Sequence, residues 1–97
     1  MRYEWDDTKA AVNIRKHGVR FSDAVRVFDD PAALVQDRTE DDYGEERWAV
    51  IGRPRLGRIL ILTVIFTERH PATVRLISAR PATGEEIDDY YARLDPL

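Results

Sequence analysis

Alternating apolar and polar positions predict five short strands along the chain. The strongest pattern is the β-branched run Arg58–Thr67, which a turn at Glu68–Thr73 joins to a second apolar run, Val74–Arg80. Three weaker patterns complete the set: Arg2–Trp5, Ala33–Gln36 and Arg47–Ile51. Because short turns connect consecutive strands in the second half of the chain, we expect an antiparallel meander there.

Apolar residues that recur at helical spacing predict a first helix near the start of the chain. It follows an aspartate cap at Asp6 or Asp7 and runs to about Lys16. Gly18 is expected to end it, because glycine adopts the left-handed conformation that closes many helices.

Two further helices are expected. A short one covers Asp23–Phe28, with Ser22 as its cap. A longer one covers Thr83–Leu94, where Thr83 and Glu86 form a Thr-x-x-Glu capping box ahead of an amphipathic stripe.

The order of the predicted elements, β-α-α-β-β-β-β-α, indicates an α+β fold. We expect a small antiparallel sheet of three to four strands, with two N-terminal helices and one C-terminal helix. The chain has 97 residues, 43% of them hydrophobic, which is enough for one small domain with a real core. A single domain over residues 1–97 is therefore predicted.

The composition excludes several classes of protein. The chain has no cysteine, so it has no disulfide framework, no thiolate nucleophile and no cysteine-based zinc site, which fits a reducing compartment. Residues 1–7 are charged and lack the apolar core of a signal peptide, and the longest apolar run, Ile59–Phe66, is too short to span a bilayer. We expect a cytoplasmic protein with no membrane partner.

Charge is distributed unevenly along the chain, whose net charge of −3 argues against indiscriminate nucleic-acid binding. Residues 29–47 hold eight acidic side chains and two basic ones, whereas residues 48–83 hold six arginines and one acid, Glu68. Arginine presents a planar fork that matches a phosphate group. The basic second half therefore indicates an anionic ligand, although a general preference for arginine over lysine would explain part of the bias.

The predicted strand Val74–Arg80 carries two arginines, which is unusual because a buried charge needs a partner. Arg75 and Arg80 are five residues apart, so strand alternation places them on opposite faces of the sheet. Only a bulge, or a position of Arg80 beyond the strand end, would let them share a site. Each is expected either to bind an anion or to pair with a helix carboxylate such as Glu86.

Several segments, taken in order, resemble the BrnT-type toxins and together cover nearly the whole chain. They are Tyr3–Asp6 with Lys9, Asn13–Val19 with Phe21, Val27–Pro31, Glu45–Trp48 with Ile51–Gly52, and Arg75–Arg80 with Ala82–Thr83, Glu86 and Tyr90. The resemblance implies a RelE-like ribonuclease fold. It also implies a toxin that cleaves RNA and is neutralised by a ribbon-helix-helix antitoxin, BrnA, in a hetero-oligomer. That complex would repress its own operon through the DNA-binding part of the antitoxin.

A ribonuclease without a metal needs a base for the 2′-hydroxyl, an acid for the 5′-oxygen and cations for the transition state. We expect His17 to supply base or acid chemistry, because adjacent Arg15 and Lys16 favour its neutral form. Arg47 and Arg80 are the expected phosphate clamps. Glu46 or Glu86 would be a second proton carrier or would orient an arginine.

The remaining RNA contacts are expected from four side chains: Lys16, Arg58, Arg75 and Tyr90. No metal site and no cofactor are expected, because two histidines without clustered carboxylates make a poor metal site.

A structural explanation stays open for each site residue. His17 could simply interact with a helix terminus, Glu86 could serve only the capping box, and Tyr90 could belong to the core. The alternative function is a catalytically inactive binding module that only partners an antitoxin or regulator.

Overall fold

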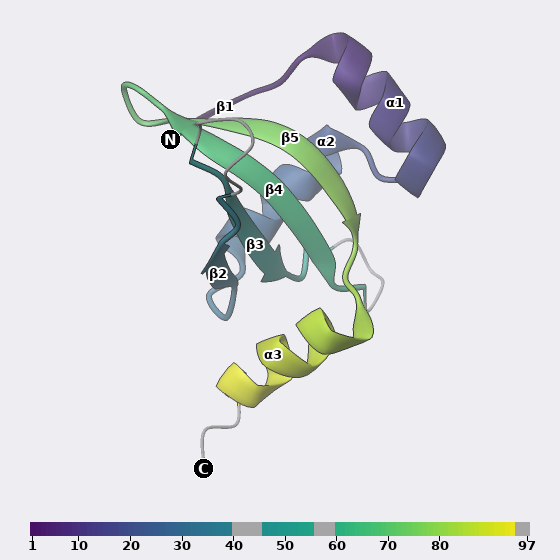
Figure 1. Ribbon diagram of the computed structural model, residues 1–97, viewed down its shortest axis with the longest axis vertical. Helices are drawn as coiled ribbons and strands as arrows, with labels where there is room; N and C mark the ends of the chain where they lie inside the picture. Colours follow the sequence, from purple (N-terminus) through teal and green to yellow (C-terminus); the bar gives the residue numbers. More distant parts are fainter. Residues whose placement is uncertain (40–45, 56–59, 95–97) are drawn as a thin grey trace.

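The computed structural model of this chain describes residues 1–39, 46–55 and 60–94 (Figure 1). In chain order the elements are β1 (Arg2–Glu4), α1 (Asp7–His17), α2 (Phe21–Ala24), η1 (Val25–Asp29, a 3₁₀ helix), β2 (Leu34–Asp37), β3 (Trp48–Gly52), β4 (Leu62–Arg69), β5 (Thr73–Pro81) and α3 (Gly84–Leu94). This α+β order agrees with the one predicted. In the described part of the chain, no helix is long and apolar enough to cross a membrane.

Helix α1 begins and ends where the sequence predicts. The Asp6 carboxylate accepts a hydrogen bond of 3.0 Å from the Lys9 amide and so caps the first turn. Gly18 adopts a left-handed conformation with φ of 70°, and its amide donates to the Ile14 carbonyl at 2.8 Å. Basic residues close the helix, as its dipole favours: Arg15, Lys16 and His17 lie in the last turn.

The second helix differs from the expected Asp23–Phe28. It begins at Phe21, changes to a 3₁₀ helix at Val25, and has no side-chain cap, so Ser22 is not its cap. The buried residues Phe21, Ala24 and Val27 recur every three positions, so they share one face across the α-helical turn and the 3₁₀ helix that follows it. Burial of that row fits the tighter winding of the segment.

The five strands described form one sheet in the order β1-β5-β4-β3-β2, and it is mixed rather than antiparallel. β1 pairs with β5 in parallel, through Arg2 opposite Thr73, whereas the other neighbours are antiparallel. We expected a RelE-like sheet of three to four antiparallel strands. That expectation was therefore wrong in the number of strands and in the direction of β1. A parallel pair needs a long connection, here most of the chain, and local sequence patterns do not specify such pairing.

Strand β4 is shifted relative to its prediction. It begins at Leu62 and continues through Glu68 and Arg69, so only residues 70–72 form the turn before β5. Arg58, predicted to begin this strand and to bind RNA, lies outside the described residues.

A β-bulge in β5 changes which side chains share a face. Ile65 pairs with Ser78 while its neighbour Phe66 pairs with Leu76, so Ile77 has no opposite residue. The extra residue reverses the alternation, and Arg75 therefore lies on the same face of β5 as Ser78 and Arg80. A bulge was one of the two ways in which the sequence analysis allowed Arg75 and Arg80 to share a site.

The two faces of the sheet are covered differently. One packs on α2 and η1, around a buried cluster that includes Phe21, Val64 and Leu76. The opposite face receives α3 only at one end, where Tyr90 contacts Ile51 and Ile61. In Figure 1, α2 lies behind β4 and β5, and α3 lies below the sheet. Much of the α3 side of the sheet is therefore free of helices among the described elements.

Candidate active site

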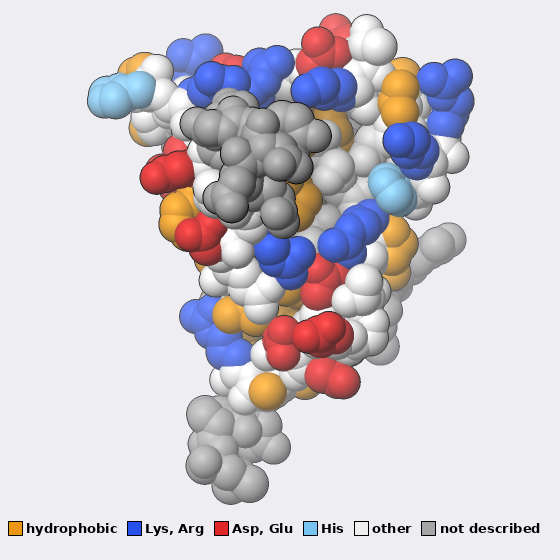
Figure 2. Space-filling model, in the orientation of Figure 1, with side chains coloured by type: hydrophobic (Ala, Val, Ile, Leu, Met, Phe, Trp, Pro, Cys, Tyr) orange, Lys and Arg blue, Asp and Glu red, His pale blue; other side chains and the backbone are white. Residues whose placement is uncertain are grey.

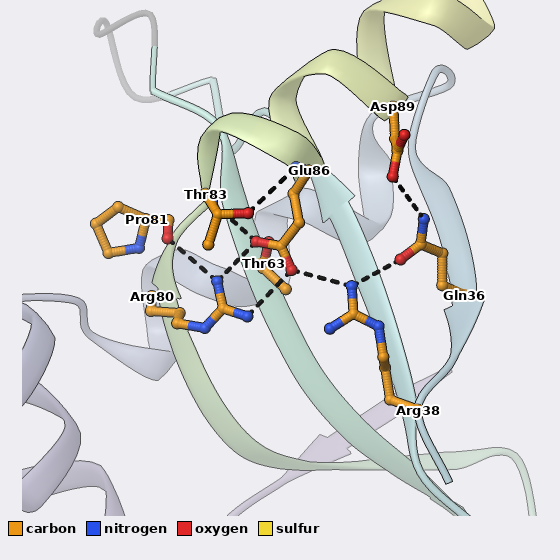
Figure 3. Close-up of polar contacts among 8 residues, drawn as sticks. All are labelled: Gln36, Arg38, Thr63, Arg80, Pro81, Thr83, Glu86 and Asp89. Carbon is orange, nitrogen blue, oxygen red and sulfur yellow. Dashed lines mark hydrogen bonds and ion pairs between the residues drawn. The ribbon is translucent and has the colours of Figure 1, made fainter.

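Glu86 is the centre of a polar cluster on the α3 side of the sheet (Figure 3). Its carboxylate accepts two parallel hydrogen bonds from Arg80, of 2.7 and 3.0 Å, and one of 3.0 Å from Arg38. Thr63, opposite Arg80 in the sheet, donates from its hydroxyl at 2.9 Å. Glu86 itself is only 5% exposed. A buried carboxylate thus holds two guanidinium groups side by side, with one net positive charge.

Local sequence explains why Glu86 occupies this position. The predicted capping box is present: the Thr83 amide donates to the Glu86 carboxylate at 2.9 Å, and the Glu86 amide donates to the Thr83 hydroxyl at 3.2 Å. The first turn of α3 is thereby fixed just after β5 ends. The same carboxylate that caps the helix faces Arg80, six residues earlier.

Glu86 remains ionised in this environment. Burial by itself raises its pKa, but hydrogen bonds from Arg80, Thr83 and Arg38 outweigh burial and hold the pKa well below its ordinary value. A carboxyl group with so low a pKa does not donate or accept protons near neutral pH. Of the two roles expected for Glu86, orienting arginine is therefore the one that fits, and proton transfer does not.

Arg38 belongs to the site, although sequence analysis did not select it. Its guanidinium donates to Glu86 and, at 2.7 Å, to the side chain of Gln36, which in turn donates to Asp89 at 3.4 Å. The signal in the sequence is weak: Arg38 is one of two basic residues in an acidic stretch, and it follows a short strand. Only the sheet order, which brings β2 near α3, identifies its role.

Both arginines keep donors for a ligand. The side chains of Arg38 and Arg80 are 32% and 28% exposed. Each has five N–H donors, of which Glu86 and neighbouring oxygens occupy only part. An open cleft of about 550 Å³ lies over them, lined by Gln36, Arg38, Arg80, Thr83, Glu85, Glu86 and Asp89. Figure 2 shows basic side chains across the middle of this view and acidic ones over α3.

His17 and Lys16 lie on the other side of β5 from β4, at the C-terminal end of α1. Both are exposed, and they line a groove of about 210 Å³ together with Ile77 and Ser78 of β5. Because Ser78 and Arg80 share a face and are two residues apart, the groove and the arginine cleft are neighbours along β5.

Of the other expected residues, Arg47 lies next to Arg38, whereas Arg75 and Glu46 have partners outside the cluster. Arg47 directly precedes β3 and is partly buried, and its carbonyl accepts from the Arg38 amide at 2.8 Å. Arg75 shares the face of Arg80 but pairs with Glu4 of β1 at 2.8 Å. The other proton-carrier candidate, Glu46, is exposed, and its carbonyl accepts from Thr67.

Tyr90 is a core residue, and its expected contact with RNA was wrong. Its side chain is 1% exposed, and its hydroxyl donates to the Asp30 carboxylate at 2.7 Å. Burial, together with the adjacent Asp30, raises the pKa of Tyr90 to about 12, so the hydroxyl stays protonated. Its position on the apolar stripe of α3 explains this, because that stripe faces the sheet.

Within residues 1–39, 46–55 and 60–94, no group of three or more histidine or carboxylate side chains is arranged to hold a metal ion. The cleft and the groove present arginine, lysine, histidine, hydroxyl and carboxylate side chains.

Comparison with known proteins defines the class of molecule to which this fold and cluster belong. The crystal structure of the Brucella abortus ribonuclease toxin BrnT superposes with a TM-score of 0.65 at 32% sequence identity, covering 86% of this chain and 97% of that one. A search of curated proteins found no match.

The family model for BrnT, the ribonuclease toxin of a type II toxin–antitoxin system, matches residues 5–86. This chain belongs to the BrnT family of toxins, as the ordered sequence segments indicated. Membership in a type II system implies an antitoxin partner.

Proposed function

We propose that this chain is an active, metal-independent endoribonuclease that inhibits translation by cleaving RNA. The observation that supports the proposal best is the pair of partly exposed guanidiniums, Arg38 and Arg80, fixed by the buried, ionised Glu86. Preorganised donors of this kind stabilise the charge that develops on a phosphate group in the transition state. RNA is the substrate class because its 2′-hydroxyl provides the internal nucleophile.

In this mechanism the two arginines, which line the cleft, bind the scissile phosphate, and Glu86 holds Arg80 in place through two hydrogen bonds. His17, across Ser78 from Arg80, takes the 2′-hydroxyl proton or gives a proton to the departing 5′-oxygen. Lys16, Arg47 and Arg75 supply further charge to the RNA backbone.

The direct test is RNA cleavage by purified variants, in buffer with and without a metal chelator. His17→Ala should slow cleavage about 10²-fold or more, the usual contribution of a positioned proton carrier. Arg80→Lys and Arg38→Lys should both lose activity, because lysine keeps the charge but not the planar fork. Arg2→Lys, at an exposed edge position, is the matched control and should cleave as the wild type does.

If folded His17→Ala and Arg80→Lys proteins cleave at the wild-type rate, the site assignment is wrong. If the wild-type chain cleaves no RNA and does not arrest growth when expressed alone, the chain is instead an inactive binding module. Activity that disappears with the chelator would contradict metal independence.

The proposal extends to regulation. We infer that a ribbon-helix-helix antitoxin of the BrnA kind covers this chain in a hetero-oligomer. Within this complex only the antitoxin contacts operator DNA, and that contact represses the operon. The acidic net charge of −3 supports an indirect role at DNA, because a DNA-binding surface is normally basic.

A further inference from the structure

The groove between α1 and β5 carries positive charge that the arginine cleft does not use. Lys9, Lys16 and His17 line its helix side, and Ile77 and Ser78 line its strand side. Lys9 and Lys16 are seven residues apart, two helical turns, so their side chains leave α1 on the same face. They are the two lysines of the whole chain. Among the described residues, no acidic side chain lines the groove.

Asn13 fixes the width of this groove. Its side-chain amide donates to the carbonyls of Val19 and Ala79, at 2.9 and 2.8 Å, and its oxygen accepts from the Ala79 amide at 3.0 Å. Asn13 is 4% exposed and takes the place of a neighbouring strand along the edge of β5. The lysine row is therefore held against the strand by a rigid, buried contact rather than by its own flexible side chains.

The groove and the arginine cleft are neighbours along β5, lined by Ser78 and Arg80 respectively. Ser78 and Arg80 lie on one face by ordinary strand alternation, roughly 7 Å apart along the strand. A nucleic-acid strand whose phosphate lies between Arg38 and Arg80 would reach Ser78 and then the lysine row with its next phosphates. The ammonium group of a lysine is a compact charge on a flexible side chain. It can therefore follow RNA phosphates whose positions differ from one RNA sequence to another.

We propose that this α1–β5 groove is a second phosphate subsite, which binds the RNA backbone next to the scissile phosphate through Lys9 and Lys16. The proposal rests on the proposed ribonuclease function and deepens it. It makes the substrate a single strand with at least two phosphates in contact, and it gives Lys9 a role in affinity rather than in chemistry.

Binding of a short 2′-O-methylated RNA oligonucleotide, which lacks the nucleophile, tests the subsite without catalysis. The affinity is measured by fluorescence anisotropy over a range of salt concentrations. Lys9→Ala and Lys16→Ala should each reduce the slope of log K against log salt by about 0.7 and lower affinity roughly fivefold at about 0.1 M salt. The backbone amide of Lys9, which donates to the Asp6 carboxylate that caps α1, is unaffected by the substitution.

Arg15→Ala is the matched control, because it removes the same charge from the same helix. Arg15 is exposed and does not line the groove, so its loss should leave the slope unchanged. A dinucleotide with one phosphate is the second control: Arg80→Ala should weaken its binding, whereas Lys9→Ala should not.

Equal effects of Lys9→Ala and Arg15→Ala would show that any positive charge on α1 attracts RNA through long-range electrostatics. That result would contradict the proposed subsite. So would lysine variants that bind RNA normally but lose the antitoxin, since the groove would then be a protein contact. Failure of the proposed function looks different: Arg80→Ala would leave both RNA probes bound as tightly as before.

Discussion

At position 86 one carboxylate closes the capping box of α3, fixes two arginines and satisfies the buried hydroxyl of Thr63. The capping role follows from the Thr-x-x-Glu spacing and was predicted. The pairing with Arg80 was one of two alternatives that the sequence left open. The contact with Arg38 was not predicted at all, because it depends on where β2 lies in the sheet.

The depressed pKa of Glu86 predicts how stability depends on pH. A folded-state pKa below the ordinary value of 4.5 means that the ionised form stabilises the fold above that pH, and that this contribution is lost as pH falls below it. Glu86→Gln should therefore be less stable than the wild type at neutral pH. The difference should shrink below about pH 4.5 in urea unfolding experiments.

The exposed neighbour Glu85 supplies the control for this experiment. Glu85→Gln should follow the wild-type curve at every pH. A Glu86→Gln curve parallel to that of the wild type throughout the acid range would contradict the assigned pKa. Asp30, whose pKa is also lowered, is present in all three proteins and cancels in the comparison.

At the scale of elements, α1 and α3 were predicted almost to the residue, because caps and a glycine stop are local signals. The second helix and the start of β4 were not, because buried packing determines their geometry. The position of α1 beside β5 depends on Asn13, a polar residue whose partner on β5, Ala79, lies 66 positions away and gives no local pattern.

Asn13→Ala should destabilise the chain by about 2–4 kcal/mol, because it leaves buried backbone groups of Ala79 without partners. Asn13→Asp should be no better, since a carboxylate can accept from the Ala79 amide but cannot donate to two carbonyls. Chemical denaturation measures both. A loss below about 1 kcal/mol would mean that water replaces the amide at this edge.

Tyr90 attaches α3 to the loop before β2 through its bond to Asp30. Tyr90→Phe should cost about 1–3 kcal/mol, because the Asp30 carboxylate then loses a buried donor. Tyr91→Phe is the matched control: Tyr91 is 40% exposed and accepts a bond from Arg53 at the surface. Comparable losses in the two variants, measured by thermal unfolding, would contradict the structural role given to the buried hydroxyl.

At the scale of the whole molecule, the α+β class and the five strand-forming segments were accessible from the sequence, but the sheet was expected to contain only three to four of them. The sheet order was not accessible, because β1 closes the fold by pairing with a strand some 70 residues later. The consequence for the site is direct: Arg38, Arg80 and Glu86 come from three separate elements, and only the assembled sheet brings them together.

Two apolar side chains of α3, Tyr91 and Leu94, remain 40% and 46% exposed in the isolated chain. Co-expression with a ribbon-helix-helix antitoxin should therefore give a complex that co-purifies, with both residues protected. Light scattering measures the assembly, and an operator-binding assay should show DNA binding by the complex but not by this chain. A chain that stays monomeric beside the antitoxin would contradict the proposed partner.

The bulge at Ile77 also has a genetic consequence. Ile77 is the residue without an opposite partner, so loss of that single codon would restore regular alternation and leave Arg75 and Arg80, then four residues apart, on the same side of the sheet. Neither arginine would turn toward the hydrophobic interior. An in-frame deletion at this one position is thus a change that a functional copy of this gene could tolerate.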